Sequence, residues 1–449
     1  MPERILFSAV GGHDPIANFR DGAILHICRI YRPDKMYLYL SSEMLERSRK
    51  DDRYRRTLIR LREYLGGGLK EIHLIERENL TEVQLFDSFY TDFDTILRQI
   101  HAENPNAELF LNLSSGTPAM KSALNVISVL SPFPIRAIQV FTPSRRENVK
   151  NEDPKIYDVE TSWELNQDNE PNFPNRCQEV HSEHLLVKIK KESIQRLLNA
   201  FNYQAALILA REISDFIPPK VMKMLEAAAC RAQLNQRGFD QARQGFGDSW
   251  IPVKMAGQRS VFEYVLSLRI KMLQGNYADF IRGLTPVVVD LFAMCLKSEL
   301  QIELEEFCEL DKNGVWKISD HKMSTSKYGK DIKKALQNQS QSMEIKYGPL
   351  GSVHILYIFR ELSQNTKLVD QMESIRKIEA SVRNTAAHEI VSVTDDWIYK
   401  KVGVHAKDIV RLLEKLVIAA GIHVQNDDWN SFDVMNQDII TALAIPLAS

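Results

Sequence analysis

The chain has 449 residues, more than one hydrophobic core usually spans, so we expect two or three domains. Its 57 basic and 59 acidic residues nearly cancel, which excludes a general nucleic-acid coat protein and restricts any RNA contact to a local surface. We find no apolar run of membrane-spanning length, no signal-peptide layout and no Cys-x-x-Cys pair among the five cysteines. We therefore expect a cytoplasmic protein without membrane contact, disulfide framework or structural metal.

Short apolar runs alternate with helical segments over residues 1–165. Strands buried on both faces have continuous hydrophobic sequences, so this alternation predicts a mainly parallel sheet in an α/β, Rossmann-like domain. Ligands of such sheets bind beyond the carboxyl ends of the strands, and the loops found there are the candidates for a site. The predicted strands are residues 5–10, 35–40, 71–75, 109–113 and 136–141.

Small residues dominate two of these loops, Gly11-Gly12-His13-Asp14-Pro15 after the first strand and Ser114-Ser115-Gly116-Thr117-Pro118 after the fourth. We expect Thr117 to cap the following helix and Pro118 to occupy its first turn, which leaves backbone N–H groups free for an anion or phosphate. Tight turns without a ligand would use the same residue types, but two such loops at two strand ends favour binding. The sequence has neither Gly-x-Gly-x-x-Gly after the first strand nor Gly-Lys-Ser/Thr, which counts against a nucleotide-cofactor enzyme.

Residues 166–176 are polar and contain two prolines, so we interpret them as a linker. Helical periodicity is then nearly unbroken to residue 275. Three turn-plus-helix starts lie roughly 36 to 38 residues apart, near the period of paired-helix repeats. We favour a helical bundle that spaces two functional domains, and predict an all-α connector over 166–275 and an all-α domain over 276–449.

The strongest amphipathic helix lies in the last of these regions and contains Arg383-Asn384-Thr385-Ala386-Ala387-His388. On a helix Asn384 and His388 share a face, whereas Arg383 lies about 140° around the axis from His388. One copy therefore does not close a compact site, and two copies meeting across a homodimer axis could line a shared cleft. Its apolar stripe is Val369, Met372, Ile375, Ile378, Val382, Ala386 and Ile390.

This hexapeptide carries groups able to cut RNA. The imidazole can move a proton to or from the 2′-hydroxyl or the leaving 5′-oxygen, and the guanidinium can hold the phosphate. Asn384 can orient either group without titrating. The 2′-hydroxyl is the nucleophile, so no metal is needed and the substrate is RNA. The spacing Arg-x-x-x-x-His arises about once by chance in a chain of this length, so the alternative is that Arg383 and His388 are exposed and unreactive. Arg176 and His181 have the same spacing, but they lie at the predicted linker, and we assign them no chemistry.

The motifs in this order resemble a known family. Gly11-Gly12-His13-Asp14-Pro15 and Leu113-Ser114-Ser115-Gly116-Thr117-Pro118-Ala119-Met120 resemble the loops of a CARF domain, the CRISPR-associated Rossmann-like sensor. Arg383-Asn384-x-x-x-His388 resembles the HEPN ribonuclease motif. Together they resemble the Csm-six ribonucleases of type III CRISPR systems over essentially the whole chain. Ser115 departs from the pattern, because many CARF loops carry a second glycine there.

The resemblance implies a CARF domain over 1–165, a HEPN domain over 276–449 and a homodimer. A cyclic oligoadenylate made by the CRISPR effector complex, with a ring of six favoured, would switch on a metal-independent endoribonuclease acting on single-stranded RNA. The CARF domain could also degrade this activator. The alternative from the residues alone is a non-catalytic nucleotide-sensing regulator with a helical partner-binding domain. By position, the implied catalytic residues are Arg383, Asn384 and His388, and the implied ligand residues are Gly11, Gly12, His13, Asp14, Ser114, Ser115, Gly116, Thr117, Pro118 and Thr142.

Overall fold

The structure is a computed structural model that describes residues 2–142, 157–180, 183–338, 345, 347–388 and 392–445, with the backbone alone described at 183 and 382–388. The chain forms two compact units, Met1–Ile189 and Lys190–Ser449. Within the described ranges, no helix combines the length and the apolar character needed to span a bilayer.

The first unit is built on a six-stranded sheet with the order β5-β4-β1-β6-β7-β8. All neighbouring strands are parallel except β7 and β8. The five predicted strands are confirmed, with ends that differ by at most one residue. The strands are β1 (Arg4–Ala9), β4 (Lys35–Leu40), β5 (Glu71–Glu76), β6 (Glu108–Asn112), β7 (Ile135–Val140) and β8 (Cys177–Val180).

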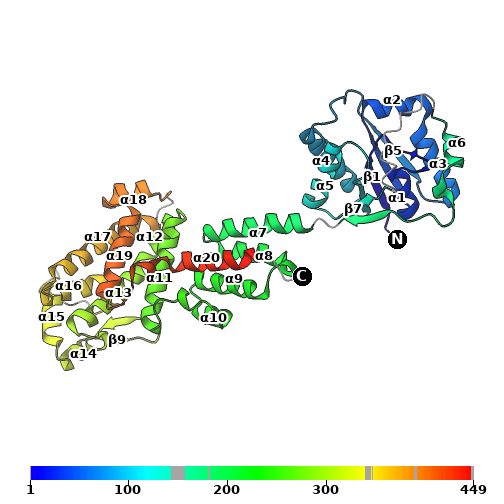
Figure 1. Cartoon of the computed structure of the whole chain (residues 1–449). Helices are drawn as coiled ribbons and strands as arrows, with labels where there is room; N and C mark the ends of the chain where they lie inside the picture. Colours follow the sequence, from blue (N-terminus) through cyan, green and yellow to red (C-terminus); the bar gives the residue numbers. More distant parts are fainter. Residues whose placement is uncertain are drawn as a thin grey trace. The chain divides into compact units, whose positions relative to one another are not determined.

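Helices cover both faces of the sheet (Figure 1). Successive side chains of β1 point to opposite faces, so Leu6 joins the core on one side while Ile5 and Phe7 join the core on the other. Both cores are apolar, as a sheet covered on both faces requires. The first core is covered by α1 (Ala23–Tyr31), α2 (Ser42–Asp51), α3 (Arg53–Leu65) and α6 (Val159–Glu164), and the second by α4 (Phe86–Glu103) and α5 (Pro118–Leu130).

The strand order reverses next to β1. The chain adds β4 and β5 on one side of β1 and then returns to add β6 and β7 on the other. In such sheets the loops after the two central strands diverge and leave a crevice where ligands bind. The loops that follow β1 and β6 are the two small-residue loops of the sequence analysis.

Residues 166–176 differ from the predicted linker, because they pack within the first unit. They include η2 (Gln167–Asn169), a short 3-10 helix that lies against a hairpin of β2 (Ile16–Ala17) and β3 (Arg20–Asp21). The Asp21 N–H donates to the Asp168 carboxylate at 3.0 Å, and Asn166 and Asp168 are buried. The polar composition of this stretch serves buried hydrogen bonds rather than solvation, and the compact unit extends past residue 165.

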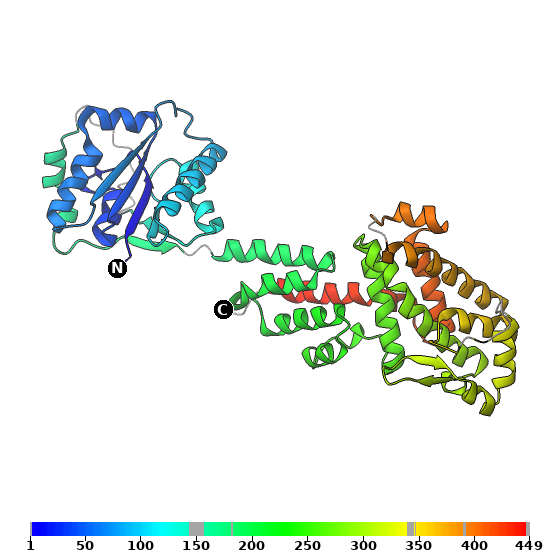
Figure 2. The same ribbon diagram turned by 180° about the vertical axis from the view of Figure 1, so that it is seen from behind.

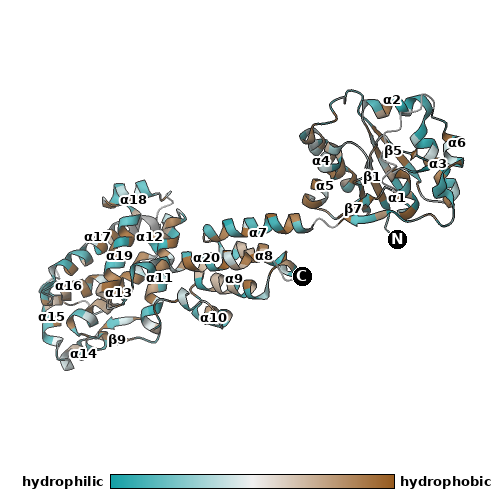
Figure 3. Cartoon of the chain, viewed as in Figure 1, coloured by the Kyte–Doolittle hydropathy of each residue, from teal (hydrophilic) through white to brown (hydrophobic). Residues whose placement is uncertain are grey.

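The second unit is mostly helical, and Figure 3 shows its helices banded in both colours, as amphipathic helices are. A small antiparallel hairpin of β9 (Cys308–Leu310) and β10 (Trp316–Ile318) departs from the all-α prediction for 276–449. Starting with the helix that crosses between the units, the helices are α7 (Glu183–Asn199), α8 (Tyr203–Arg211), α9 (Pro219–Ala232), α10 (Gln236–Ala242), α11 (Ala256–Leu273), α12 (Tyr277–Arg282), α13 (Leu284–Leu300), α14 (Asp320–Thr325), α15 (Gly329–Asn338), α16 (Ser352–Leu362), α17 (Thr366–His388), α18 (Asp395–Val402), α19 (Ala406–Ala419) and α20 (Ser431–Ala444).

The last helix, α20, returns to the predicted connector, and both Figure 1 and Figure 2 show it beside α8 and α9. The Asn436 side chain donates to the Leu198 carbonyl at 2.8 Å. Buried Arg231 forms an ion pair with Glu263 at 2.9 Å and donates to the Ser431 hydroxyl at 2.8 Å. Connector and C-terminal residues therefore share one compact unit, and its predicted division at residue 275 stays a prediction.

Candidate ligand pocket and catalytic helix

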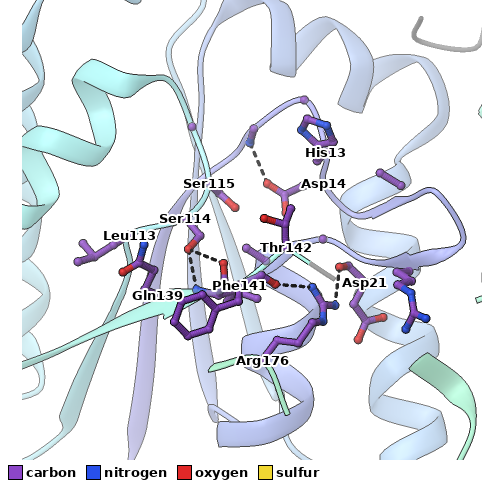
Figure 4. A pocket seen from close by; sticks show the side chains of 18 of the residues that line it. His13, Asp14, Asp21, Leu113, Ser114, Ser115, Gln139, Phe141, Thr142 and Arg176 are labelled. Atoms are coloured by element: carbon purple, nitrogen blue, oxygen red, sulfur yellow. Dashed lines mark hydrogen bonds between the residues drawn. The ribbon is translucent and has the colours of Figure 1, made fainter. Parts of the chain in front are cut away.

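A cavity of about 380 Å³ lies at the carboxyl ends of β1 and β6 (Figure 4). It brings the two small-residue loops together, with the end of β7 and the β2–β3 hairpin completing its walls. Thr117 and Pro118 are not among its lining residues. The predicted ligand residues that line it are Gly11, Gly12, His13, Asp14, Ser114, Ser115, Gly116 and Thr142, and further charged and polar lining residues are Arg20, Asp21, Lys121, Gln139 and Arg176.

Glycine is required where the two loops touch. Gly116 has a φ of +92°, and a Cβ there would lie 3.0 Å from the Ala9 side chain. A Cβ on Gly11 would lie 2.7 Å from the Gly116 nitrogen, so the two loops pack backbone against backbone. Gly12 differs, because a Cβ there would meet nothing within 4 Å.

Asp14 ties the first loop to its surroundings. Its buried carboxylate accepts from the Gly11 N–H at 2.9 Å and from the Ile24 N–H at 3.2 Å, and it is also hydrogen-bonded to Ser115. The Ile24 contact satisfies a donor at the start of α1, whose N-cap Gly22 has no side chain to do so. Burial raises the pKa of Asp14, although these hydrogen bonds oppose the shift.

Hydrogen bonds with buried groups fix the positions of Ser114 and Ser115. The Asn112 side chain donates to the Ser8 and Ser115 hydroxyls, both at 2.9 Å, and accepts from the Ser114 N–H at 2.8 Å. The Ser114 hydroxyl accepts from the Val140 N–H at 2.7 Å, which joins this loop to β7. The serine found in place of a second glycine therefore supplies a buried hydroxyl that connects Asn112 with Asp14.

The electrostatics of the cavity suit an anion. The Thr117 hydroxyl accepts from the Met120 N–H, and Pro118 opens α5, which confirms the predicted cap and first turn. Both α5 and α1 begin beside the cavity, and helix N-termini carry partial positive charge. Lys121 adds a full positive charge at the same place. A phosphate-bearing ligand fits this combination of backbone dipoles and side-chain charge.

A buried charged cluster that the sequence did not reveal adjoins the cavity, and its members Asp21 and Arg176 line the cavity wall. Arg176 donates to the Asp168 carboxylate at 2.8 Å, and Arg29 forms an ion pair with Asp21 at 2.7 Å. Burial opposes ionisation of Asp21, yet hydrogen bonds from His26 and Arg29 hold its pKa below the usual value. These residues are separated by up to about 150 positions in sequence, as Arg176 and His26 are, so no spacing signal could reveal them.

Donor atoms of Asp21, His26 and Asp168 lie within 4.8 Å of one another, close enough to hold a metal ion. Their carboxylates, however, already accept hydrogen bonds from Arg29 and Arg176. Two buried guanidinium groups would repel a bound cation, so we interpret the cluster as an ion-pair network.

The predicted motif helix is confirmed as α17 (Thr366–His388). Met372, Ile375 and Ile378 of its apolar stripe are buried. Arg383, Asn384 and His388 lie in its C-terminal part, where the backbone is helical and the side chains lie outside the description. Ile390 and His181 also lie outside the described residues.

One turn before the motif, α17 is anchored by the buried carboxylate of Glu379. The Ser352 hydroxyl donates to it at 2.9 Å, and Arg376 lies 3.4 Å away. His354 caps the start of α16 by accepting from the Gly351 N–H at 3.0 Å. Burial and the nearby Arg376 charge lower the pKa of His354, which favours the neutral ring that this cap requires.

Comparisons with known proteins agree along the whole chain. Residues 71–177 match the model of the Csm6 CARF domain, 180–232 that of the Csm6 6H domain, and 250–440 that of the Csm6 HEPN domain. The chain is 31% identical over 438 residues to the CRISPR system endoribonuclease Csm6 of Mycobacterium tuberculosis, covering 97% of this chain and 98% of the relative. It is 26% identical to the endoribonuclease Csm6′ of Streptococcus thermophilus, covering 98% of this chain and 100% of the relative.

The fold also matches that of a solved structure. Enterococcus italicus Csm6, described as bound to cyclic hexa-2′-fluoro-hexa-dAMP, superimposes with a TM-score of 0.72 over 98% of this chain and 100% of that chain, at 21% identity. At this level of identity the match supports the fold. With an α/β sensor-like unit first, a helical unit after it and a curated relative at 31% identity, the chain belongs to the Csm6 family of CARF–HEPN endoribonucleases of CRISPR systems.

Proposed function

We propose that a cyclic oligoadenylate binds the cavity at β1 and β6 and activates RNA cleavage by the motif of α17 in a homodimer. The observation that carries the proposal is the cavity itself, where two helix N-termini, Lys121 and two glycine-containing loops meet at the switch point of the sheet. The related Enterococcus italicus protein is described with a cyclic hexa-adenylate analogue, which favours a ring of six.

The proposed reaction needs no metal-bound nucleophile. His388 accepts the proton of the 2′-hydroxyl as its oxygen attacks the adjacent phosphorus, and the bond to the 5′-oxygen breaks. The leaving oxygen takes up a proton, supplied by an imidazolium, and the products carry a 2′,3′-cyclic phosphate and a 5′-hydroxyl. Arg383 stabilises the charge on the pentavalent phosphate, and Asn384 orients the reacting groups. The substrate is single-stranded RNA, whose ribose can adopt the geometry for in-line attack.

Two copies of the motif complete the site in this proposal. On the helix, Arg383 and His388 are about 140° apart, so one α17 cannot direct both side chains at one phosphate. A two-fold axis that pairs α17 with its copy would supply His388 from both sides of a shared cleft. The non-catalytic regulator considered in the sequence analysis loses its support, because the curated relatives are endoribonucleases.

The test is cleavage of labelled single-stranded RNA by the purified chain in EDTA, with no activator, cyclic tetra-adenylate, cyclic hexa-adenylate or linear hexa-adenylate. We expect cleavage with the cyclic hexamer, and product 3′ ends that accept a ligated adapter only after the cyclic phosphate has been opened and the resulting phosphate removed. A cleavage rate that is the same with and without each adenylate, or cleavage that requires a divalent metal, would contradict the proposal. Following the activator by chromatography in the same reactions shows whether the CARF domain also degrades it.

A further inference from the structure

Arg176 joins the two walls of the cavity to the strand that leads out of the first unit. We propose that it is the positioning residue that couples occupancy of the cavity to RNA cleavage in the second unit. This inference rests on the proposed function, because it takes a cyclic oligoadenylate as the occupant. It concerns a residue that the sequence analysis assigned to a linker without chemistry.

The guanidinium of Arg176 bridges walls that come from different parts of the chain. Its Nη1 donates to the Phe141 carbonyl at 3.2 Å, just beyond the end of β7. Its Nη2 donates to the Asp21 carbonyl at 3.0 Å, at the end of β3 (Figure 4). Phe141 and Asp21 both line the cavity, so a ligand that moves either wall also pulls on this guanidinium.

Arg176 is fixed too tightly to move alone. Its side chain is 9% exposed and pairs at 2.8 Å with Asp168, whose carboxylate is fully buried. Its backbone N–H donates to Nε2 of buried His26 at 3.0 Å, so α1 holds the backbone of Arg176. Separating these groups would leave buried charges without partners, so the residue and its backbone shift together.

The backbone of Arg176 opens the route to the second unit. The next residue, Cys177, begins β8 and pairs with Val140 at the end of β7. Three residues after β8 ends, α7 begins at Glu183, and α7 continues across the division between the units at Ile189 and Lys190. A displacement of Arg176 therefore acts on the covalent connection between the ligand-binding unit and the catalytic unit.

The alternative is that Arg176 binds the ligand directly. Its two terminal nitrogens already donate to protein oxygens, and Nε is buried with no hydrogen-bond partner among the described groups. Lys121 and Arg20 also line the cavity, with side chains that are less buried than that of Arg176. A residue that couples without binding has a distinct signature, because its loss lowers the activated rate and leaves activator affinity largely intact.

The test compares Arg176→Lys with the matched control Arg29→Lys in the full-length protein. Both variants keep a positive charge within the same buried cluster, beside Asp168 for residue 176 and beside Asp21 for residue 29, but a lysine at 176 cannot bridge both walls, and Arg29 is not among the residues that line the cavity. Calorimetry measures the Kd for cyclic hexa-adenylate, and RNA cleavage at saturating activator measures the maximal rate. For Arg176→Lys we expect a Kd within about threefold of wild type and a maximal rate reduced about tenfold or more. For Arg29→Lys we expect changes below about threefold in both.

A second variant tests the same route in case Arg176→Lys does not fold. Insertion of Gly-Gly after Val180 leaves every cavity contact intact and interrupts the same route, so we expect the same separation of Kd from rate. If Arg176→Lys loses activator affinity and maximal rate to the same extent, Arg176 binds the ligand and the inference is wrong. Unchanged maximal rates in both Arg176→Lys and the Gly-Gly insertion would also overturn it. If no cyclic adenylate activates the wild-type protein, both the proposed function and this inference are wrong. If cyclic hexa-adenylate activates the wild-type protein and both variants equally, only the coupling role of Arg176 is wrong.

Discussion

The cavity of the first unit and the motif of α17 are assembled in different ways. The cavity takes its residues from the ends of β1, β6 and β7, a hairpin and a segment more than 150 positions further along the chain than the first loop. The motif takes Arg383, Asn384 and His388 from a single helical stretch. A long-range site depends on many buried polar contacts and tolerates few backbone changes, whereas a local motif depends on a few side chains and on the partner that completes it.

The largest effect should come from the catalytic helix. His388→Ala removes the proposed general acid and base, so we expect RNA cleavage at saturating activator to fall by roughly 10²- to 10⁴-fold while activator binding stays unchanged. Initial rates on labelled RNA and calorimetry measure the two quantities. His423→Ala removes an exposed histidine of the same unit and serves as the control. Equal losses in both variants would refute the assignment of His388.

In the cavity, backbone geometry should matter more than any single side chain. A side chain at Gly116 is strained at a φ of +92° and crowds Ala9, with a conformational cost of about 1–2 kcal/mol. For Gly116→Ala we expect the activator concentration for half-maximal cleavage to rise roughly five- to thirtyfold, with the maximal rate retained. Gly12→Ala, in open space, should change it by less than about twofold. Similar activator titration curves for Gly116→Ala and Gly12→Ala would show that the close contact between the two loops does not control activator binding.

Ser115 tests whether the buried polar contacts stabilise the first unit. Ser115→Ala removes a hydroxyl that accepts from Asn112, so we expect the free energy of unfolding to fall by about 1 kcal/mol. Urea denaturation followed by circular dichroism measures the change. Ser128→Ala, which removes a hydroxyl bonded within α5 to the Asn125 carbonyl, is the control and should cost less. A neutral Ser115→Ala would show that the loop does not need this contact.

The smallest effect is a pH dependence in the second unit. The pKa of His354 is lower in the folded protein than its ordinary value of 6.5. Below that value the unfolded chain binds the proton first, so the stability contributed by the neutral ring is fully present above pH 6.5 and declines as pH falls toward the folded pKa. We expect His354→Gln to lose stability at pH 7.5 but to show a shallower decline from pH 7 to 5.5. Identical pH profiles for variant and wild type would contradict this role.

The sequence predicted the sheet well because its strands are continuous apolar runs between helices. Residues 5–10 and 109–113 needed no long-range information, since the strands they predict are central in the sheet and burial on both faces gives a continuous apolar run. Thr117 and Pro118 were also predictable, because a cap and a first-turn proline are local features. The segment 166–176 was misread, since its polar residues look solvated until Asp168 and Arg176 are seen to pair inside the unit.

By itself, then, the sequence determined the order of the elements, the two glycine-containing loops and the helix that carries Arg383 and His388, because each is a pattern of neighbouring residues. Only the tertiary structure decided that Gly11 meets Gly116, that Ser115 faces inward, and that Arg176 closes the base of the cavity. The physical reason is that backbone contact and buried charge pairing depend on which segments a fold brings together, and residues far apart in the chain carry no spacing that reveals it.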